Sequence, residues 1–348
     1  MKKDGKAVLA SERKPWKTAR MFSLLAAVLL LVFLVSFSLG RYGVPIPEVL
    51  RILISRVIPL AKTWTPEMET VVINIRLPRI LMACMVGCSL SAAGAAYQGV
   101  FQNPMASPDI LGASSGAAFG AALAILLGAS SRMITMAAFA SGMVTVCIVF
   151  LLAQRAPGLK VVNLILAGMM ISSLFTAGTS YIKLVADPTN QLPAITYWLM
   201  GSLSGAKLKD VAFVMLPMAI GLIPLLLLRW QINILTLGDE EARPLGVNTT
   251  LLRFVVIVCA TLVTAASISV SGMIGWVGLV IPHLSRKLVG SNYRHLMPAT
   301  YLAGAAFLLI VDNVSRNLLA VEIPIGILTA FIGAPFFIYL IFRKENSL

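Results

Sequence analysis

The stretch Gly272–Arg286, which reads GMIGWVGLVIPHLSR, indicates the class of this protein. It is apolar enough for a membrane, yet residues that break or charge a spanning helix recur along it: Gly272, Gly275, Gly278, Pro282, His283 and Arg286. In hydrocarbon, backbone groups freed by such breaks are tolerated only where protein or a water-filled cavity surrounds them. A span interrupted by glycine and proline therefore predicts a packed, polytopic protein that moves something across a membrane.

The composition outside this stretch is that of a membrane protein. Of 348 residues, 58% are hydrophobic and 12% are charged, against about 25% charged in soluble domains. A spanning helix needs about 20 apolar residues, and the sequence offers ten such stretches: 21–40, 80–101, 109–129, 133–153, 162–185, 210–229, 251–271, 274–289, 297–318 and 324–342. We predict an all-α integral membrane protein of about ten transmembrane helices, with a short, broken eighth span.

The charges indicate how the chain lies in the membrane. The net charge of +14 comes from lysines and arginines near span ends, which is how membrane proteins orient themselves and not a nucleic-acid footprint. If the N-terminus is cytoplasmic, 17 of the 28 basic residues lie inside. We expect a basic cytoplasmic tail at 1–20, one permease domain at 21–343 and a cytoplasmic tail at 344–348. The outer segment Arg41–Thr70 is expected to be amphipathic across Ile46–Leu60 and to lie on the membrane surface.

Motifs for catalysis are absent from the sequence. There is no G-x-x-x-x-G-K-[ST] phosphate loop, so the chain does not hydrolyse ATP itself. His283 and His295 lie twelve residues apart, a poor spacing for metal ligands, and we expect no metal site. Asp312 is the one clear carboxylate within a predicted span. It is interpretable either as a proton relay or as a hydrogen-bonded structural residue.

The longest inner loop, at 234–250, reads ILTLGDEEARPLGVNTT and holds the only acidic cluster. Asp239 and Glu240 ahead of an Ala-Arg-Pro-Leu-Gly step predict a short helix with acids at its positive end. Such a run is either a solvated loop or a cytoplasmic helix on which a motor protein pushes.

Several motifs together resemble one family. They follow in sequence order: RLPR at 76–79, QNPMASP at 102–108 leading to LG at 111–112, YWLMGS at 197–202, the loop from 237 to 246, the stretch Gly272–Arg286, PIG at 324–326 and GAP at 333–335. From Arg76 to Arg343 the chain looks like the FecCD-type permease subunit of bacterial ABC importers for iron(III)-siderophores, haem and cobalamin.

The resemblance implies partners and a location. It implies a homodimer or a pair with a paralogous permease in the bacterial inner membrane, with both termini cytoplasmic and the pathway on the dimer axis. Two ATP-binding subunits, which use ATP and Mg, are expected below, and an extracytoplasmic substrate-binding protein above. The chain itself is expected to be non-catalytic and to hold no cofactor.

The resemblance also implies roles for particular residues. Residues of the family's ATPase-coupling helix correspond to Gly238, Asp239, Glu240, Ala242, Leu245 and Gly246. Outer arginines that meet acidic residues of the binding protein correspond to Arg76, Arg79 and Arg316. Arginine suits this role because its planar fork binds both oxygens of a carboxylate. Snorkelling of arginines at span ends is the alternative.

The fifth, eighth and tenth predicted spans are expected to line the pathway, with the fifth offering the side chains named here. Val161 and Val162 align with the cytoplasmic gate, where they would form a dry constriction, or they simply begin the fifth helix. Soft and weakly polar side chains follow on that helix: Met169, Ser172, Ser173 and Thr176. A path for a large chelate should bind nothing tightly, because specificity can be delegated to the binding protein.

We therefore predict the permease subunit of an ATP-driven importer, with an iron(III)-siderophore as the expected cargo. Haem and cobalamin are alternatives on the same scaffold. Two other classes stay open, a proton-coupled secondary transporter that uses Asp312 and an integral-membrane enzyme with a dispersed site.

Overall fold

The computed structural model describes residues 15–157 and 160–345, which form only helices and connecting segments. The first half comprises α1 (Pro15–Ser38), α2 (Ile46–Ile54), α3 (Pro66–Thr70), the π-helix η2 (Val71–Arg76), α4 (Leu77–Val100), the 3-10 helix η3 (Pro108–Leu111), α5 (Ala113–Leu126), α6 (Ser131–Arg155) and α7 (Lys160–Val185). The second half comprises α8 (Gln191–Met200), α9 (Leu208–Leu227), α10 (Arg229–Leu235), α11 (Asp239–Ala242), the 3-10 helix η4 (Arg243–Leu245), α12 (Thr249–Ser271), α13 (Val277–Val289), α14 (Tyr293–Asn317) and α15 (Ile325–Glu345).

Each of the ten predicted spans overlaps a different helix of at least 13 residues. By length and composition, seven helical segments of the described chain can cross a membrane, and the longest runs from Pro66 to Val100. Helix α5 and the apolar part of α15 are shorter, and α13 has only 13 residues. The membrane-protein class and the helical fold follow, while the number of ten spans remains a prediction.

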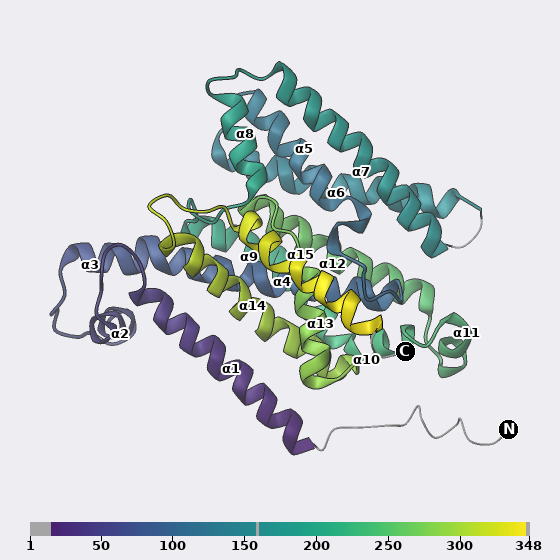
Figure 1. Ribbon diagram of the computed structural model, residues 1–348, viewed down its shortest axis with the longest axis horizontal. Coiled ribbons are helices and arrows are strands. Elements are labelled where there is room, and N and C mark those ends of the chain that lie inside the picture. Colours follow the sequence, from purple (N-terminus) through teal and green to yellow (C-terminus); the bar gives the residue numbers. More distant parts are fainter. Residues whose placement is uncertain (1–14, 158–159, 346–348) are drawn as a thin grey trace.

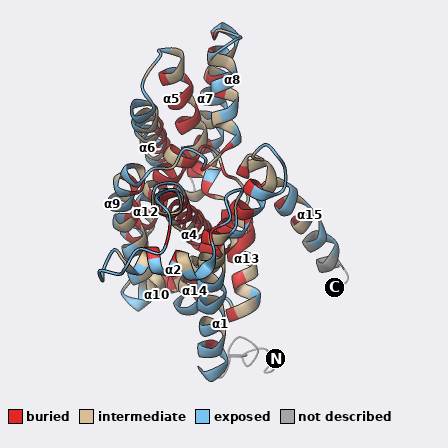
Figure 2. Cartoon of the chain, turned by 90° about the vertical axis from the view of Figure 1, so that its left-hand side faces the viewer, coloured by how far each residue is buried: buried red, intermediate tan, exposed pale blue. Residues whose placement is uncertain are grey.

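Helix α4 lies at the centre of the bundle. Figure 2 shows its buried residues surrounded by α12, α13 and α14. Close contact depends on glycine: a Cβ at Gly87 would lie 2.2 Å from the Gly304 carbonyl oxygen, and one at Gly94 would lie 1.8 Å from that of Gly278. Missing side chains let helix backbones approach closely in a membrane. The helices that flank the site are therefore fixed against one rigid element.

The ends of the bundle differ in character. Helices α2 and α3 lie at one end of the molecule, and α10 and α11 lie at the other (Figure 1). We call these the α2 end and the α11 end. In the segment Arg41–Thr70 the amphipathic helix predicted for Ile46–Leu60 is shorter, and corresponds to α2 alone. Its apolar residues Val49 and Ile52 are buried against the protein's own core. The helix stops at Ile54 and the chain then turns.

Candidate functional site

Three predicted docking arginines come together at the α2 end. Arg79 Nε on α4 donates to Asp312 Oδ1 at 2.8 Å, and Arg316 Nε lies 3.2 Å from Asp312 Oδ2. Asp312 is fully buried, and the two arginines are 6% and 9% exposed. A buried carboxylate is stable in such a place because two guanidinium groups compensate its charge.

Arg76 sits beside this pair at the end of α1. Its guanidinium donates to the carbonyl oxygens of Phe37 and Tyr42, and Arg316 Nη2 reaches the Ser36 carbonyl at 3.4 Å. The last carbonyls of a helix lack partners and carry partial negative charge, so cations are favoured there. Arg76 is 3% exposed. All three arginines therefore point into the subunit in this conformation, and their role in docking stays a prediction.

Glu322 completes the cluster and was not predicted from the sequence. It lies in the segment between α14 and α15, and its Oε1 accepts from Arg79 Nη1 at 2.9 Å. Its side chain is 31% exposed, whereas Asp312 is inaccessible. The sequence feature that could have indicated it is a single carboxylate between hydrophobic residues, six residues after Arg316. We define the arginine cluster as Arg76, Arg79, Asp312, Arg316 and Glu322.

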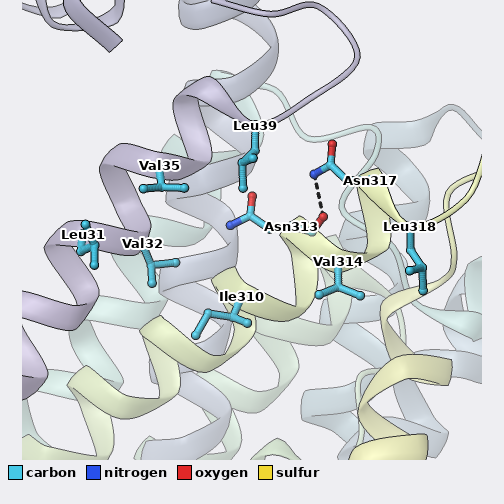
Figure 3. A pocket seen from close by; sticks show the side chains of 9 residues that line it. All are labelled: Leu31, Val32, Val35, Leu39, Ile310, Asn313, Val314, Asn317 and Leu318. Atoms are coloured by element: carbon cyan, nitrogen blue, oxygen red, sulfur yellow. Dashed lines mark hydrogen bonds between the residues drawn. The ribbon is translucent and has the colours of Figure 1, made fainter. Parts of the chain in front are cut away.

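A largely apolar groove of about 500 Å³ runs beside the cluster, between α1 and α14 (Figure 3). Leu31 and Val35 of α1 and Leu39 just after it line one side, and Ile310 and Val314 of α14 line the other. Its polar groups are satisfied within the protein: Asn313 Nδ2 donates to Ser36 Oγ at 2.7 Å, and Asn317 Nδ2 to the Asn313 carbonyl. The groove is thus an apolar surface and not a polar recognition site.

Helix α7 carries the predicted pathway residues on an open face. Met169 is 51% exposed, and Ser173 and Thr176 are exposed one and two turns further on. The hydroxyls of Ser173 and Thr176 donate to carbonyls one turn back, Met169 and Ser172. The face therefore offers little unsatisfied polarity. Ser172 is placed differently, because it packs beside Gly112, where an added Cβ would lie 2.6 Å from its Oγ.

A second open face belongs to α15. Phe331 and Tyr339 are 75% and 55% exposed, and the described part of the helix packs only along one side, on α8, α13 and α14. In Figure 2, α7 and α15 lie on either side of a space that no other helix fills. The large exposed side chains of both helices, such as Met169 and Phe331, are apolar, so this space is bounded largely by apolar side chains.

One carboxylate lies near this space. Asp109 in η3 is exposed, accepts from the Ser114 hydroxyl, and lines a cavity of about 150 Å³ with Trp276 and Gly278. No ion pair involving Asp109 is found within the described part of the chain. Trp276 adopts a left-handed backbone conformation, φ 69°, which is rare for a bulky residue and marks a constrained position.

The stretch Gly272–Arg286 is broken at its first glycines, as predicted, but the predicted interruption at Pro282 and His283 is wrong, because both residues lie inside the continuous helix α13. Helix α12 ends at Ser271, and α13 begins at Val277. Gly272 has φ 66°, and a Cβ there would lie 2.2 Å from the Trp198 carbonyl. Gly278 allows the close contact with α4, while Gly275 has open space around it. The glycines thus serve different purposes, a turn at one end and a helix crossing at the other.

The later residues of that stretch anchor α13. Arg286 Nη1 donates to Gln98 Oε1 at 2.5 Å and its Nη2 to Tyr293 Oη at 3.4 Å, so α13 is tied to α4 and α14. His283 packs edge-on against Phe336 of α15, with a ring separation of 5.9 Å. Pro282 lies within α13. These contacts hold α13 and α15 beside one another at the open space.

The predicted coupling loop forms two short helical turns at the α11 end. Gly238 and Gly246 bracket them, with φ of 108° and 76°. Ala242 is fully buried and Leu245 is 57% exposed. The side chains of Asp239 and Glu240 lie outside those that the structure describes. An exposed leucine on a protruding turn is available for contact with another protein, but the coupling role is untested.

The predicted gate residues lie at the start of α7. Val161 is partly buried and packs against the hydrophobic core, whereas Val162 is 45% exposed. Both are within the first turn of the helix, as the simpler interpretation required. Among the described residues Val162 is only half covered, and its role as a gate remains a prediction.

These features define a class: a polytopic membrane protein with open, largely apolar helix faces and no recognisable catalytic motif. Comparison with known proteins gives the family. The model of the FecCD transport family matches residues 28–343. The chain belongs to this family, and it is a non-catalytic permease subunit of an ABC importer. In such importers ATP is hydrolysed by a separate chain.

Several curated relatives share most of the sequence. The molybdate import system permease protein MolB of Haemophilus influenzae is 40% identical over 93% of this chain and 95% of its own. A probable iron chelatin permease of Helicobacter pylori is 41% identical, over 80% and 85%. The hemin transport permease HmuU of Yersinia pestis is 39% identical, over 79% and 84%.

A solved structure has the same fold. It is a metal-chelate type ABC transporter in an inward-facing conformation, 39% identical, with a TM-score of 0.83 over 93% of this chain and 99% of that one. A more distant match, PsaBC of Streptococcus pneumoniae, has 15% identity and a TM-score of 0.55. The alternatives of a proton-coupled carrier and a membrane enzyme are set aside, because the family is one of ABC permeases.

Proposed function

We propose that this chain passes an iron chelate, most simply an iron(III)-siderophore, from a substrate-binding protein into the cytoplasm. The observation that carries the proposal is the open face of α7, where Met169, Ser173 and Thr176 are exposed and the hydroxyls are already bonded to their own helix. Such a surface lets a bulky ligand pass without a tight site. Relatives named for iron chelatin and hemin support this cargo.

A second cargo, molybdate, has its own support. One relative that is matched over most of its length is a molybdate permease. Asp109 argues against a small anion here, because its exposed carboxylate lies beside the open space without a paired cation. A compact dianion is repelled where it passes close to this carboxylate. A large chelate can keep its charged centre farther away.

The same proposal assigns the two ends of the molecule. The α2 end, with the arginine cluster, is proposed to face the binding protein, and the α11 end is proposed to face the ATPase in the cytoplasm of a bacterial cell, where both termini are also expected. The open faces of α7 and α15 are proposed to meet a second permease, identical or paralogous, so that the path runs between subunits. Large exposed apolar faces with a common orientation support such a partner.

The test begins with the tagged chain, solubilised from its native membrane and analysed by mass spectrometry. We expect an ATP-binding subunit and a substrate-binding protein to copurify. The recovered binding protein is then titrated with ferric siderophores, haem, cobalamin and molybdate. Preferential binding of molybdate would replace the proposed cargo, and uptake by the chain alone without ATP would contradict the mechanism.

The coupling role has a separate test. Asp239→Lys combined with Glu240→Lys reverses charge on α11 and should leave the permease inserted but detached from the ATPase. The matched control is Arg229→Gln, which changes a charge on the neighbouring α10. An intact, ATP-responsive complex from the double variant would contradict the assignment.

A further inference from the structure

We propose that Glu322 is a displaceable internal counter-ion, which occupies Arg79 until an acidic side chain of the binding protein takes its place. The inference rests on the proposed docking at Arg79. It adds that docking is an exchange of carboxylates, and that the exchange releases the segment that leads into α15.

The two carboxylates that hold Arg79 are not equivalent. Asp312 contacts Arg79 Nε from within the bundle and is fully buried. Glu322 contacts Nη1 from the surface, and its side chain is 31% exposed. Approach from outside therefore meets Glu322 first, while Asp312 stays as the permanent partner.

The contact between Arg79 and Glu322 is also incomplete. Arg79 Nη2 and Glu322 Oε2 are both buried, and neither has a hydrogen-bond partner. Arginine pairs most strongly when two parallel N–H groups bind both oxygens of a carboxylate. A carboxylate that engaged Nη1 and Nη2 together would satisfy a donor that Glu322 leaves unpaired. The replacement is therefore favourable at the level of the hydrogen bonds.

The net charge of the arginine cluster also favours binding of an acidic side chain from the partner. The arginine cluster contains three guanidinium groups and two carboxylates, so it keeps one positive charge in excess. Removing one partner of a buried ion pair is strongly unfavourable unless another takes its place. Glu322 should therefore leave only as a new carboxylate arrives, which makes release dependent on the partner.

Glu322 is carried by a segment suited to move. Residues 318–324 have no regular structure, and Leu318, Leu319 and Val321 are 61%, 59% and 74% exposed. Exposed apolar residues beside an ion pair form a surface that a protein partner can cover. Few contacts hold the segment, among them the Arg41 guanidinium to the Ala320 carbonyl and Ser315 Oγ to the Ile323 carbonyl at 2.6 Å.

Release of Glu322 would be felt at the start of α15. The Ile325 N–H donates to the Gly201 carbonyl at 2.9 Å. At Gly326 an added Cβ would lie 2.5 Å from the Met200 carbonyl and 2.7 Å from that of Met273. The first turn of α15 is thus wedged between the end of α8 and the break before α13. Glu322 is only three residues before Ile325. A movement of Glu322 would therefore be transmitted to the first turn of α15 and to the open space beside it.

The test measures affinity of the reconstituted permease complex for its binding protein. Glu322→Gln should bind at least about threefold tighter at low salt, with the gain lost as ionic strength rises. Glu67→Gln is the matched control, because it removes an exposed negative charge at the same end. In an Arg79→Gln background, Glu322→Gln should give no gain. Unchanged or weaker binding by Glu322→Gln, or an equal gain without Arg79, would overturn the exchange.

Two further readouts separate the possible failures. If Arg79→Gln alone leaves affinity unchanged, the proposed docking at Arg79 falls. If Arg79→Gln weakens binding while Glu322→Gln does not raise the affinity, only the proposed exchange of carboxylates is contradicted. Hydrogen exchange in the unmodified complex needs no variant to fold: the Ile323 amide, bonded to the Ser315 carbonyl at 3.2 Å, should exchange faster on docking. Equal or slower exchange there would contradict release of the segment.

Discussion

Single residues in this permease show how an ionisable group is kept inside an apolar bundle. Asp312 is inaccessible to solvent and pairs with Arg79 of α4 and with Arg316 one turn further along α14. Taken alone in the sequence, it suggested either a proton relay or a structural residue. Its ion pairs with two guanidinium groups support the structural interpretation.

Asp312→Asn should therefore destabilise the protein. The change removes the buried anion that Arg79 and Arg316 share and leaves Arg316 without a carboxylate partner in the described part of the chain, and breaking a buried ion pair costs about 3–5 kcal/mol. We expect a clear fall of the unfolding temperature in detergent. Glu48→Gln is the control: its pair with Arg51, at 3.3 Å, is largely exposed on the arginine side and should be worth less than about 1 kcal/mol. Equal shifts for both variants would contradict the account.

Asp109→Asn should relax discrimination against small anions. The carboxylate lines the cavity with Trp276, and a like charge at about 4 Å costs about 1–4 kcal/mol for effective dielectrics of 80 to 20. In proteoliposomes with the partner subunits, we expect molybdate passage to rise about fivefold or more, with chelate uptake little changed. Molybdate transport that is fast in the unmodified protein would refute both the prediction and the proposed cargo.

Elements of this fold are held at their ends by polar contacts. The turn between α7 and α8 is organised by Asp187, whose carboxylate accepts from the N–H groups of Thr189 and Asn190 at 3.3 and 2.8 Å. Gln191 then donates to the Leu126 carbonyl at the end of α5 at 2.9 Å. The turn thus fixes three helices relative to one another.

This turn gives a prediction for pH. Hydrogen bonds from the backbone of Thr189 and Asn190 lower the pKa of Asp187 below its ordinary value of 3.8. A lowered pKa in the folded state means that the contribution to stability is complete above pH 3.8 and is lost as pH falls through the lowered pKa. Asp187→Asn should slightly lower the unfolding temperature at pH 7, and the difference from the unmodified protein should vanish in acid. A difference in unfolding temperature that did not change with pH would indicate that the geometry of the Asp187 side chain, and not its charge, stabilises the turn.

At the scale of the whole molecule, the subunit is open along α7 and α15. A path that carries water through the assembled permease predicts that thiols on the open face ionise and react. In a cysteine-free background, Ser173→Cys and Thr176→Cys should be labelled by a membrane-impermeant methanethiosulfonate reagent. Leu30→Cys is the control, because it is 59% exposed on α1 but expected to face lipid. Equal labelling of Leu30→Cys would contradict the placement of the path.

The membrane class, the helical fold and the family were predictable from local patterns. Apolar runs of about 20 residues need no tertiary information, and the glycines of Gly272–Arg286 predicted the break before α13. Pathway residues on α7 were predicted as a group, but helical spacing alone did not separate Ser172, which packs beside Gly112, from the exposed Ser173. The position of each helix is set by residues close together in sequence, and it can therefore be predicted from short stretches.

The tertiary structure decided what the arginines touch. Arg79 meets Asp312 and Glu322 across 233 and 243 residues of sequence, and no periodicity relates positions so far apart. A guanidinium at the end of a span looks the same in sequence whether it snorkels, docks a partner or pairs inside. Only the packing of α1, α4 and α14 brings a buried carboxylate within reach, because the free energy of an ion pair depends on distance and burial.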